Sequence, residues 1–176
     1  MPPADTLCPI SLNTAAVLTG RSLRTWQRRI EDGLVPRLGD GRALVPFDAV
    51  APELALTLTP EDVDVLVRAD QGNAAAQADV GALLALAALD EAKAQAGSRS
   101  APLARGGMVP ALHFLTQAAQ QGEADAMHWL GLLHAGGLCD GDGDALALMW
   151  IAKAAAHGHV VAQRQLAGLM PDGRAA

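Results

Sequence analysis

Residues 122–131 read GEADAMHWLG, and residues 72–81 (GNAAAQADVG) and 158–167 (GHVVAQRQLA) carry the same pattern at the same spacing. Each segment opens with glycine, has alanine four positions later, and has an aliphatic residue four positions after that. Residues four apart lie on one face of a helix, and small residues on that face let a second helix approach closely. The three segments therefore predict the first helices of a helical repeat.

A second shared phrase precedes two of these glycines: FLxxAA begins at Phe114 and WIxxAA begins at Trp150. Gly122 and Gly158 are 36 residues apart, which suits one helix-turn-helix unit, whereas Gly72 and Gly122 are 50 residues apart. The surplus falls in residues 96–107 (AGSRSAPLARGG), which have no apolar period. We therefore expect an insertion in the turn of the first unit.

From about residue 72 to residue 169, these phrases resemble Sel-1-like repeats, which are relatives of the tetratricopeptide repeat. The unit between Gly122 and Gly158 carries most of the pattern, although Leu133 stands where the family usually has tyrosine. The resemblance implies an α/α superhelix whose concave face docks a partner protein and which performs no chemistry. The matching residues are Asp144, Ala145, Trp150, Lys153, Ala154 and Ala155.

The sequence before Pro52 predicts a helix-turn-helix. Apolar residues from Ile10 to Leu18 indicate a short helix opened by Ser11 or Asn13, followed by a turn at Thr19-Gly20 and a second helix from Ser22. Along the second helix an apolar face has the spacing i, i+3, i+7, and the polar residues face outward or flank it. The apolar residues are Leu23, Trp26 and Ile30, and the polar ones are Arg21, Arg24, Thr25, Gln27, Arg28 and Arg29.

The residues after the second helix predict a wing. The helix is expected to stop at residues 31–33 (EDG), and two short strands, around residues 34–36 and 44–47, flank the turn at residues 39–41 (GDG). Arg37 and Arg42 bracket this turn.

Residues 10–54 resemble the winged helix-turn-helix of MerR-type regulators and excisionases. The phrases that carry the resemblance are AAxLTGxSLRTW from Ala15, GLVP from Gly33, Gly41-Arg42, and DAV from Asp48. The resemblance implies that Arg24 and Thr25 face the major groove of DNA, that Arg42 grips the DNA backbone, and that Trp26 belongs to the core. Arg28 and Arg29 replace aromatic residues common in MerR proteins, and no long coiled-coil helix follows, so the shorter excisionase form is the closer match.

Two interpretations of the arginine-rich helix stay open. An arginine cluster on the recognition helix suits phosphate and guanine contacts, so we expect DNA binding by Arg21, Arg24, Thr25, Arg28 and Arg42. A solvated helix face is the alternative, and charge favours it, because residues 1–55 hold six arginines and six acids. Trp26 is expected in the core instead of stacking on a base. Trp129 and Trp150 are also expected in the core, although an open tryptophan could anchor a partner.

The chain offers no evident active site. The five histidines lie at spacings that do not suit a helical metal pair, so we expect no metal and no cofactor. Residues 140–144 (DGDGD) begin like a calcium loop, but Ala145 and Ile151 stand where such a loop needs glycine and glutamate. We expect an acidic turn in which Asp144 caps the next helix.

Charge and cysteine content suggest the setting. The net charge of −6 comes from residues 56–176, which hold 7 basic and 13 acidic residues, so this half is expected to meet a protein instead of DNA. Cys8 and Cys139 are single thiols in different halves, which suits a reducing compartment. We see neither a signal sequence nor a membrane span and expect a cytoplasmic protein.

Together these patterns predict a mainly α chain: a winged helix-turn-helix in residues 1–55 and an α/α solenoid of about three helical-hairpin repeats in residues 56–176. The leading hypothesis is a DNA-binding regulatory adaptor, not an enzyme, whose helix-turn-helix engages DNA while the repeats dock a partner protein. A pure protein-interaction scaffold and an enzyme regulator that binds its target in the concave groove are the alternatives. A single winged domain binds a short site weakly, so specific DNA binding would need a homodimer or a DNA-bound partner.

Overall fold

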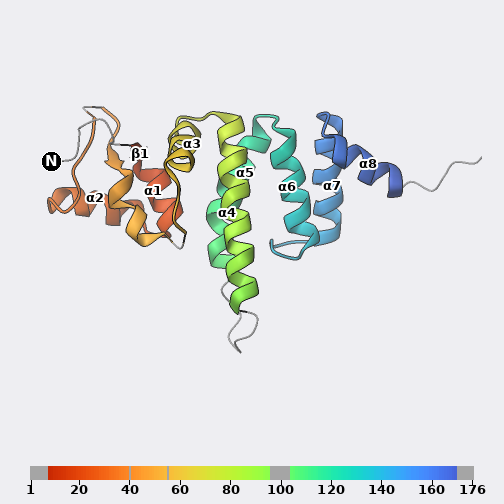
Figure 1. Ribbon diagram of the computed structural model, residues 1–176, viewed down its shortest axis with the longest axis horizontal. Coiled ribbons are helices and arrows are strands. Elements are labelled where there is room, and N and C mark those ends of the chain that lie inside the picture. Colours follow the sequence, from red (N-terminus) through yellow and green to blue (C-terminus); the bar gives the residue numbers. More distant parts are fainter. Residues whose placement is uncertain (1–7, 40, 55, 96–103, 170–176) are drawn as a thin grey trace, which may run out of the picture. The chain divides into compact units, whose positions relative to one another are not determined.

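The computed structural model describes residues 8–39, 41–54, 56–95 and 104–169. The fold is mainly α, as predicted, with a small N-terminal region of helices and strands followed by helices packed in sequence as pairs (Figure 1). The chain divides into two compact units, Met1–Ala76 and Gln77–Ala176. The predicted boundary lay earlier, after residue 55.

Two short helices joined by a tight turn open the N-terminal unit. Helix α1 spans Leu12–Thr19 and α2 spans Leu23–Glu31. Ser11 and Ser22 cap them, because each hydroxyl accepts a hydrogen bond from the backbone N–H three residues later. Gly20 has a φ of +66°, a left-handed conformation that glycine adopts without strain. The predicted helix-turn-helix geometry is confirmed.

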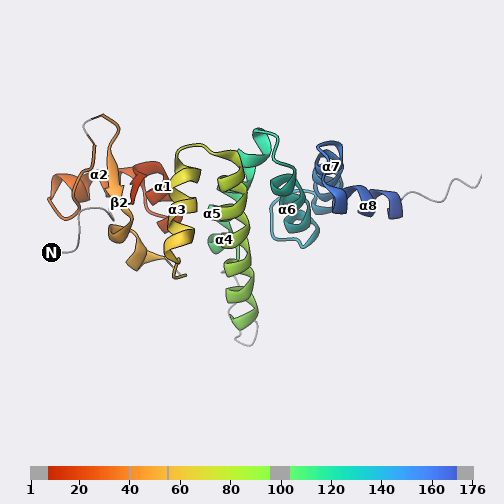
Figure 2. The same ribbon diagram turned by 45° about the horizontal axis from the view of Figure 1, so that its top comes forward.

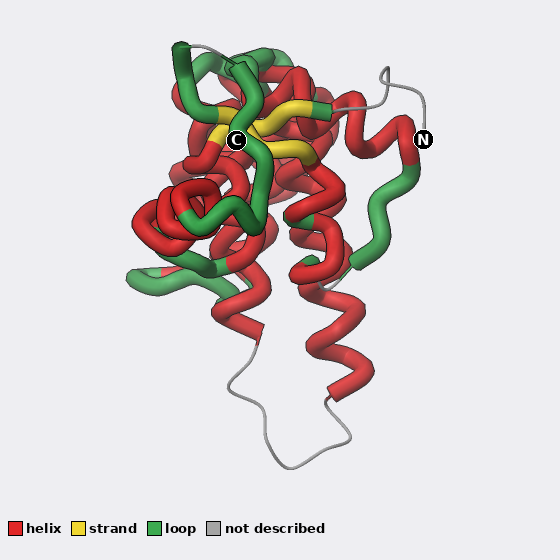
Figure 3. The backbone as a smooth tube through the Cα atoms, turned by 90° about the vertical axis from the view of Figure 1, so that its left-hand side faces the viewer, coloured by secondary structure: helices red, strands yellow, loops and turns green. Residues whose placement is uncertain are grey.

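The strand arrangement differs from the prediction. Strand β1 (Pro9–Ser11) pairs antiparallel with β2 (Leu44–Pro46), with Ile10 opposite Val45 (Figure 3). The assignment of Ile10 to the first helix was therefore wrong. Ile10 and Val45 are both fully buried, so pairing these segments covers apolar side chains as well as backbone groups. Ahead of β2, the wing has a single bridge, between Leu38 and Leu44, in place of a strand at residues 34–36. Asp40, in the predicted turn, lies outside the described residues.

Trp26 anchors the core of this unit. Its side chain is fully buried, as predicted, and its indole Nε1 donates to Thr19 Oγ1 at 3.3 Å. Leu23 was expected on the same apolar face, but it is 46% exposed because it begins α2 at the edge of the turn. The core also takes in Phe47, from the 3₁₀ turn Phe47–Ala49, and Val50, which precedes a second turn, Ala51–Glu53.

Helix α3 (Pro60–Asp70) completes the N-terminal unit. Thr59 and Asp62 form a reciprocal capping box at its start, and Pro60 occupies the first helical position, as predicted. At its end, the Asp70 carboxylate accepts hydrogen bonds from the Ser11 backbone N–H at 3.0 Å and from the hydroxyls of Ser11 and Thr14. The Asp70 side chain is only 5% exposed. This buried carboxylate fastens α3 to β1 and to the first turn of α1, so α3 belongs with the helix-turn-helix.

The second unit consists of helices that follow one another as antiparallel pairs (Figure 2). The order is α4 (Ala74–Gln95), α5 (Ala104–Gln120), α6 (Ala124–Ala135), α7 (Gly143–Ala156) and α8 (Val160–Leu169). Of the expected insertion, residues 104–107 are the start of α5, and residues 96–103 lie outside the described part.

The three repeated glycines have one geometry. Gly72, Gly122 and Gly158 have φ values of +93°, +96° and +93°. The residue after each glycine donates its backbone N–H to a carbonyl five residues earlier, at 3.1, 3.1 and 2.9 Å. This is the Schellman ending of a helix, and it turns the chain sharply toward the next helix.

Two further glycines mark close contacts between helices. A Cβ on Gly81 would lie 2.6 Å from Leu115 Cγ, and one on Gly131 would lie 2.7 Å from Ile151 Cγ1. Both neighbours come from the second repeated phrase. In α4 and α6, the glycine therefore lets an aliphatic residue of the following helix approach closely, as the sequence pattern predicted.

We expect Gly131→Ala to destabilise the protein and Gly168→Ala not to. The added Cβ at residue 131 would press on Ile151 and on backbone at 3.3 Å, whereas at residue 168 it would meet no described atom within 4 Å. Overpacking costs about 1–3 kcal/mol, and replacing a helical glycine with alanine contributes about 1 kcal/mol in both variants. Urea unfolding followed by circular dichroism measures the difference. Equal stabilities for the two variants would contradict the close contact at Gly131.

Asp70→Asn is expected to lower the free energy of unfolding by about 2–4 kcal/mol, because it leaves buried donors facing an amide that accepts less and also donates. Asp64→Asn is the matched control. Asp64 is on the same helix, is 74% exposed, and pairs only with Arg68 among the described residues, so its loss should cost under about 0.5 kcal/mol. The comparison uses chemical denaturation of both variants. If they lose the same stability, Asp70 does not have the role assigned to it.

Candidate nucleic-acid interface

The solvent-facing side of α2 gathers the polar residues that the sequence singled out. Arg24 and Arg28 are four residues apart and lie on the same face of the helix. They line an open surface hollow together with Gln27, Glu31 and Asp32. A neighbouring hollow adds Ser22 and Thr25 to the arginines of this face. The structure therefore brings Arg24, Thr25 and Arg28 together.

Of the four arginines between residues 21 and 29, Arg24 and Arg28 are the least engaged by the rest of the described protein. Arg24 is exposed, and within the described ranges its side chain has no hydrogen-bond or ion-pair partner. Arg28 is 80% exposed and lies 3.7 Å from Asp32, one turn along the helix. Such an exposed pair contributes well under 1 kcal/mol, so Arg28 remains available to another anion.

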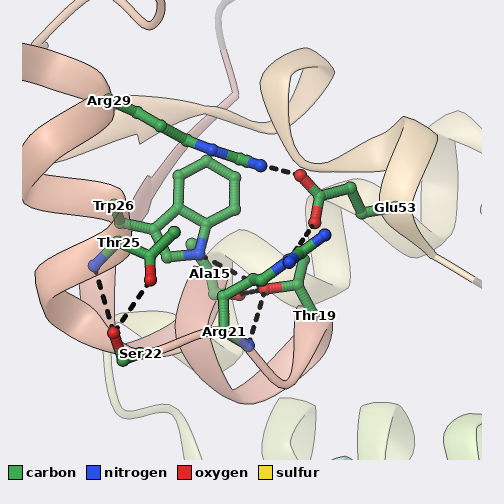
Figure 4. A network of polar contacts seen from close by, with 8 residues as sticks. All are labelled: Ala15, Thr19, Arg21, Ser22, Thr25, Trp26, Arg29 and Glu53. Atoms are coloured by element: carbon green, nitrogen blue, oxygen red, sulfur yellow. Dashed lines mark hydrogen bonds and ion pairs between the residues drawn. The ribbon is translucent and has the colours of Figure 1, made fainter. Parts of the chain in front are cut away.

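Two other arginines of the cluster are held by Glu53. Arg21 Nε donates to Glu53 Oε2 at 2.9 Å, and Arg29 Nη1 donates to Glu53 Oε1 (Figure 4). The guanidinium of Arg29 also lies over the Trp26 ring, 4.7 Å from its centroid. Because both oxygens of one carboxylate are used, Arg21 and Arg29 serve to close the 3₁₀ turn at Ala51–Glu53 over α2.

The hydrogen bond from Arg29 holds the pKa of the Glu53 carboxyl below its ordinary value of 4.5, with Arg21 adding to the effect. Partial burial acts in the opposite direction but does not cancel it. Glu53 is therefore ionised throughout the neutral range.

Thr25 has a local structural role. Its backbone N–H donates to Ser22 Oγ at 3.1 Å, and its hydroxyl lies 2.9 Å from the same oxygen (Figure 4). Thr25 thus takes part in the cap of α2 while its half-buried side chain lies beside Arg24 and Arg28.

Arg42 lies on the wing segment, away from α2 in sequence. Its guanidinium is 63% exposed and comes within 3.8 Å of the Asp70 carboxylate. The structure thus places the five predicted residues in two environments. Arg24, Thr25 and Arg28 share the exposed face of α2, whereas Arg21 and Arg42 are each drawn to a carboxylate of the same unit.

Sequence analysis missed the two acids that organise these arginines. Glu53 and Asp70 lie 32 and 28 residues from Arg21 and Arg42 in the chain, so no local spacing pointed to them. The one available signal was the equal number of acids and arginines in residues 1–55.

In the described part of the repeat unit, the cationic side chains of Lys93, Lys153 and Arg164 are far apart in the sequence and form no comparable cluster. Trp129 and Trp150 are half-buried, so the prediction of core positions holds only in part, and Lys153 lies 4.6 Å from the centre of the Trp150 ring. His128 and His159 stack with their centroids 4.1 Å apart, and His128 Nε2 lies 2.9 Å from Gln165 Oε1. Among the described residues no group of histidine, cysteine or acidic side chains could hold a metal ion.

The acidic turn before α7 also differs from the prediction. Asp142, and not Asp144, is the N-cap of this helix, because Asp142 Oδ1 accepts from the Ala145 backbone N–H at 3.2 Å. Asp144 lies inside the first turn of α7, where its charge still complements the helix dipole.

Comparison with known proteins returned no matching family model, no matching curated protein and no matching solved structure. Within the described residues, no helix has both the length and the apolar character needed to cross a membrane.

We expect Glu53→Gln to lower the free energy of unfolding by about 1–2 kcal/mol at pH 7, since it removes two charge-assisted hydrogen bonds at a partly exposed site. The folded pKa of Glu53 is below its unfolded value, so its contribution is complete above about pH 4.5 and is lost as the pH falls through the folded pKa. The difference between wild type and variant should therefore shrink on acidification.

Thermal unfolding from pH 7 to pH 3 measures this difference, with Asp48→Asn, a change at an exposed acid of the same segment, as the control. A Glu53→Gln effect that is constant over the whole pH range would show that the carboxylate charge is not what stabilises the turn.

Proposed function

We propose that the N-terminal unit binds DNA through the exposed face of α2 and that the repeat unit docks a partner protein, so that the chain acts as a regulatory adaptor. The proposal depends on one observation: two arginines of the cluster are paired with a carboxylate, and two are left exposed. Arg21 and Arg29 are held by Glu53, whereas Arg24 and Arg28 are left together and exposed on the second helix of a helix-turn-helix. In such a motif this helix is the element that enters the major groove.

The resemblance to MerR-type and excisionase domains supports this assignment, as the Sel-1-like phrases support protein docking by the repeats. Within the proposal, Arg24 reads bases, Arg28 contacts a phosphate, and Thr25 fixes the start of the helix. Arg21 and Arg42 are each paired with a carboxylate of the same unit. We therefore propose that they contribute positive charge near the DNA but make weaker contacts with it. Specific binding would involve a homodimer or a DNA-bound partner, because one winged unit covers few base pairs.

The cytoplasm is the compartment that we propose for this activity, because Cys8 and Cys139 are both unpaired thiols.

Arg24→Ala and Arg28→Ala should each weaken DNA binding, by about 1–3 kcal/mol where the arginine contacts a base. For an arginine that contacts a phosphate, the slope of log affinity against log salt should fall by about 1. Binding of the full chain to mixed genomic fragments over a salt series measures both effects. Arg68→Ala is the control, since Arg68 is an exposed arginine on α3, outside the α2 face, that pairs with Asp64. Equal losses for all three variants would mean that charge alone, and not the α2 face, drives binding.

A protein-interaction scaffold without DNA binding is the second candidate. The observation that favours it is that carboxylates neutralise part of the arginine cluster. Glu53, Asp70 and Asp32 each lie within ion-pair distance of at least one arginine. Under this alternative the same salt series gives no binding even at low salt, and α2 serves as a docking surface.

A further inference from the structure

Helix α8 repeats the surface on which the earlier first helices receive their partners. Ala167 stands in the repeat where Gly81 and Gly131 stand, and those glycines lie directly beneath Leu115 and Ile151 of the following helix. On the opposite side of α8, Ala162 is fully buried, as is Ala126 at the same position of α6. Helix α8 is therefore packed on the preceding pair as α6 is, and only its second face lacks a neighbour in the described chain.

That second face is exposed at positions that are covered in α6. Val160, Gln163, Arg164 and Ala167 have helical spacing i, i+3, i+4, i+7, and all four are exposed. At the equivalent positions of α6, Met127 is 4% exposed and Gly131 is buried. Terminal helices of repeat proteins usually present a polar outer face to water. Here the face carries one charge, Arg164, beside a 56% exposed valine.

The first hairpin shows what kind of helix such a face accepts. Gln77 occupies in α4 the position that Gln163 occupies in α8, and it is 3% exposed. Its amide donates to Gln117 Oε1 on α5 at 3.0 Å and accepts from Nε2 of Gln121, the residue directly after α5, at 2.7 Å. Leu115 and Ala118, on the same helix as Gln117, are both fully buried. The face of α4 is therefore complemented by a simple pattern: an aliphatic residue, an amide two positions later, and an alanine directly after the amide. In α5 these are Leu115, Gln117 and Ala118.

We infer that the open face of α8 binds an α-helix of a partner protein with the side-chain pattern of α5. The partner's aliphatic residue lies on Ala167, and its amide side chains meet Gln163. The Cβ of Ala167 occupies part of the space that glycine leaves free, so this helix lies slightly further away than α5 lies from α4. Gln163 Nε2 donates to the Ala155 carbonyl at 3.0 Å, which leaves its oxygen available to the partner.

This inference rests on the protein-docking half of the proposed function and is independent of DNA binding. It places the partner beside α8, the last helix that the structure describes, on a surface that the chain itself covers in α4 and α6.

The test uses the whole 176-residue chain and a fluorescent synthetic peptide that copies residues 108–122, which span the C-terminal part of α5 and the two residues after it. We expect saturable binding, measured by fluorescence anisotropy, that weakens at least about tenfold for Ala167→Glu, equivalent to about 1.4 kcal/mol. Ala167 is exposed, so its substitution does not disturb the fold. A peptide carrying Leu115→Glu should not bind.

Val161→Glu is the matched control. Val161 is 50% exposed on another side of α8, at the position of Ala75 and Asp125, which are exposed in their own helices. Binding should be unchanged in this variant. Absence of saturable binding, or equal binding by Ala167→Glu, overturns the inference.

Sedimentation of the protein without peptide tests whether the α8 face binds a second copy of the chain. A dimer that Ala167→Glu dissociates would assign the face to a second copy and would also overturn the partner-helix assignment. The DNA-binding series with Arg24→Ala is unaffected by any of these results, so failure of the docking site and failure of the DNA interface can be told apart.

Discussion

The buried carboxylate of Asp70 is the interaction on which the N-terminal unit depends. It joins α3 to β1 and α1, which are more than 50 residues away in the chain, through two hydroxyl groups and a backbone N–H. Burying an unpaired carboxylate costs several kcal/mol, so the arrangement is stable only because these donors and the guanidinium of Arg42 surround the charge. The same network fixes Ser11, whose hydroxyl also caps α1. Strand pairing, the start of α1 and the position of α3 are therefore coupled.

Asp70 also breaks a local rule in a way that the tertiary structure compensates. An acidic residue in the last turn of a helix opposes the helix dipole, and Asp70 is the final residue of α3. Its carboxylate lies instead at the N-terminus of α1, where a negative charge is favoured. The negative charge of Asp70 is unfavourable at the C-terminus of α3 but favourable at the N-terminus of α1. This interaction holds the two helices together.

Glu53 has a comparable effect on the surface of the unit. By engaging Arg21 and Arg29 it reduces a run of four arginines to one exposed pair, and it places the guanidinium of Arg29 on Trp26. Like-charge repulsion within α2 is lowered, and the conformations open to Arg24 and Arg28 are not restricted by a strong partner. A neutral domain can therefore present a locally positive face.

The sequence was sufficient where the signal was local. Ser11, Ser22 and Pro60 mark helix starts through capping chemistry, and the spacing of glycine and alanine located the repeat helices. Strand β1 could not be predicted, because three residues ending in a capping serine have no period, and only pairing with β2 makes them extended. In the acidic turn, three aspartates could each cap a helix, and the choice of Asp142 depends on where the chain leaves α6. For the candidate site, α2 and its arginines were predictable. The separation into held and exposed arginines was not, because Glu53 and Asp70 act over long sequence distances.

Apolar contact alone does not determine which repeat helices pair, because the first helix of every unit has a similar surface of small residues. The α4–α5 pair adds specific side-chain hydrogen bonds. The Gln77 amide donates to Gln117 and accepts from Gln121, and Gln117 Nε2 lies 2.8 Å from His113 Nε2. Burial lowers the pKa of His113, which keeps the ring neutral and able to accept this hydrogen bond.

At the equivalent position α6 has Met127, which is 4% exposed and whose side chain could not satisfy the amides of Gln117 and Gln121. A helix carrying these amides at this position of α6 would therefore bury them without partners, at a cost of about 1–3 kcal/mol for each group, so the glutamine at residue 77 favours the pairing of α4 with α5.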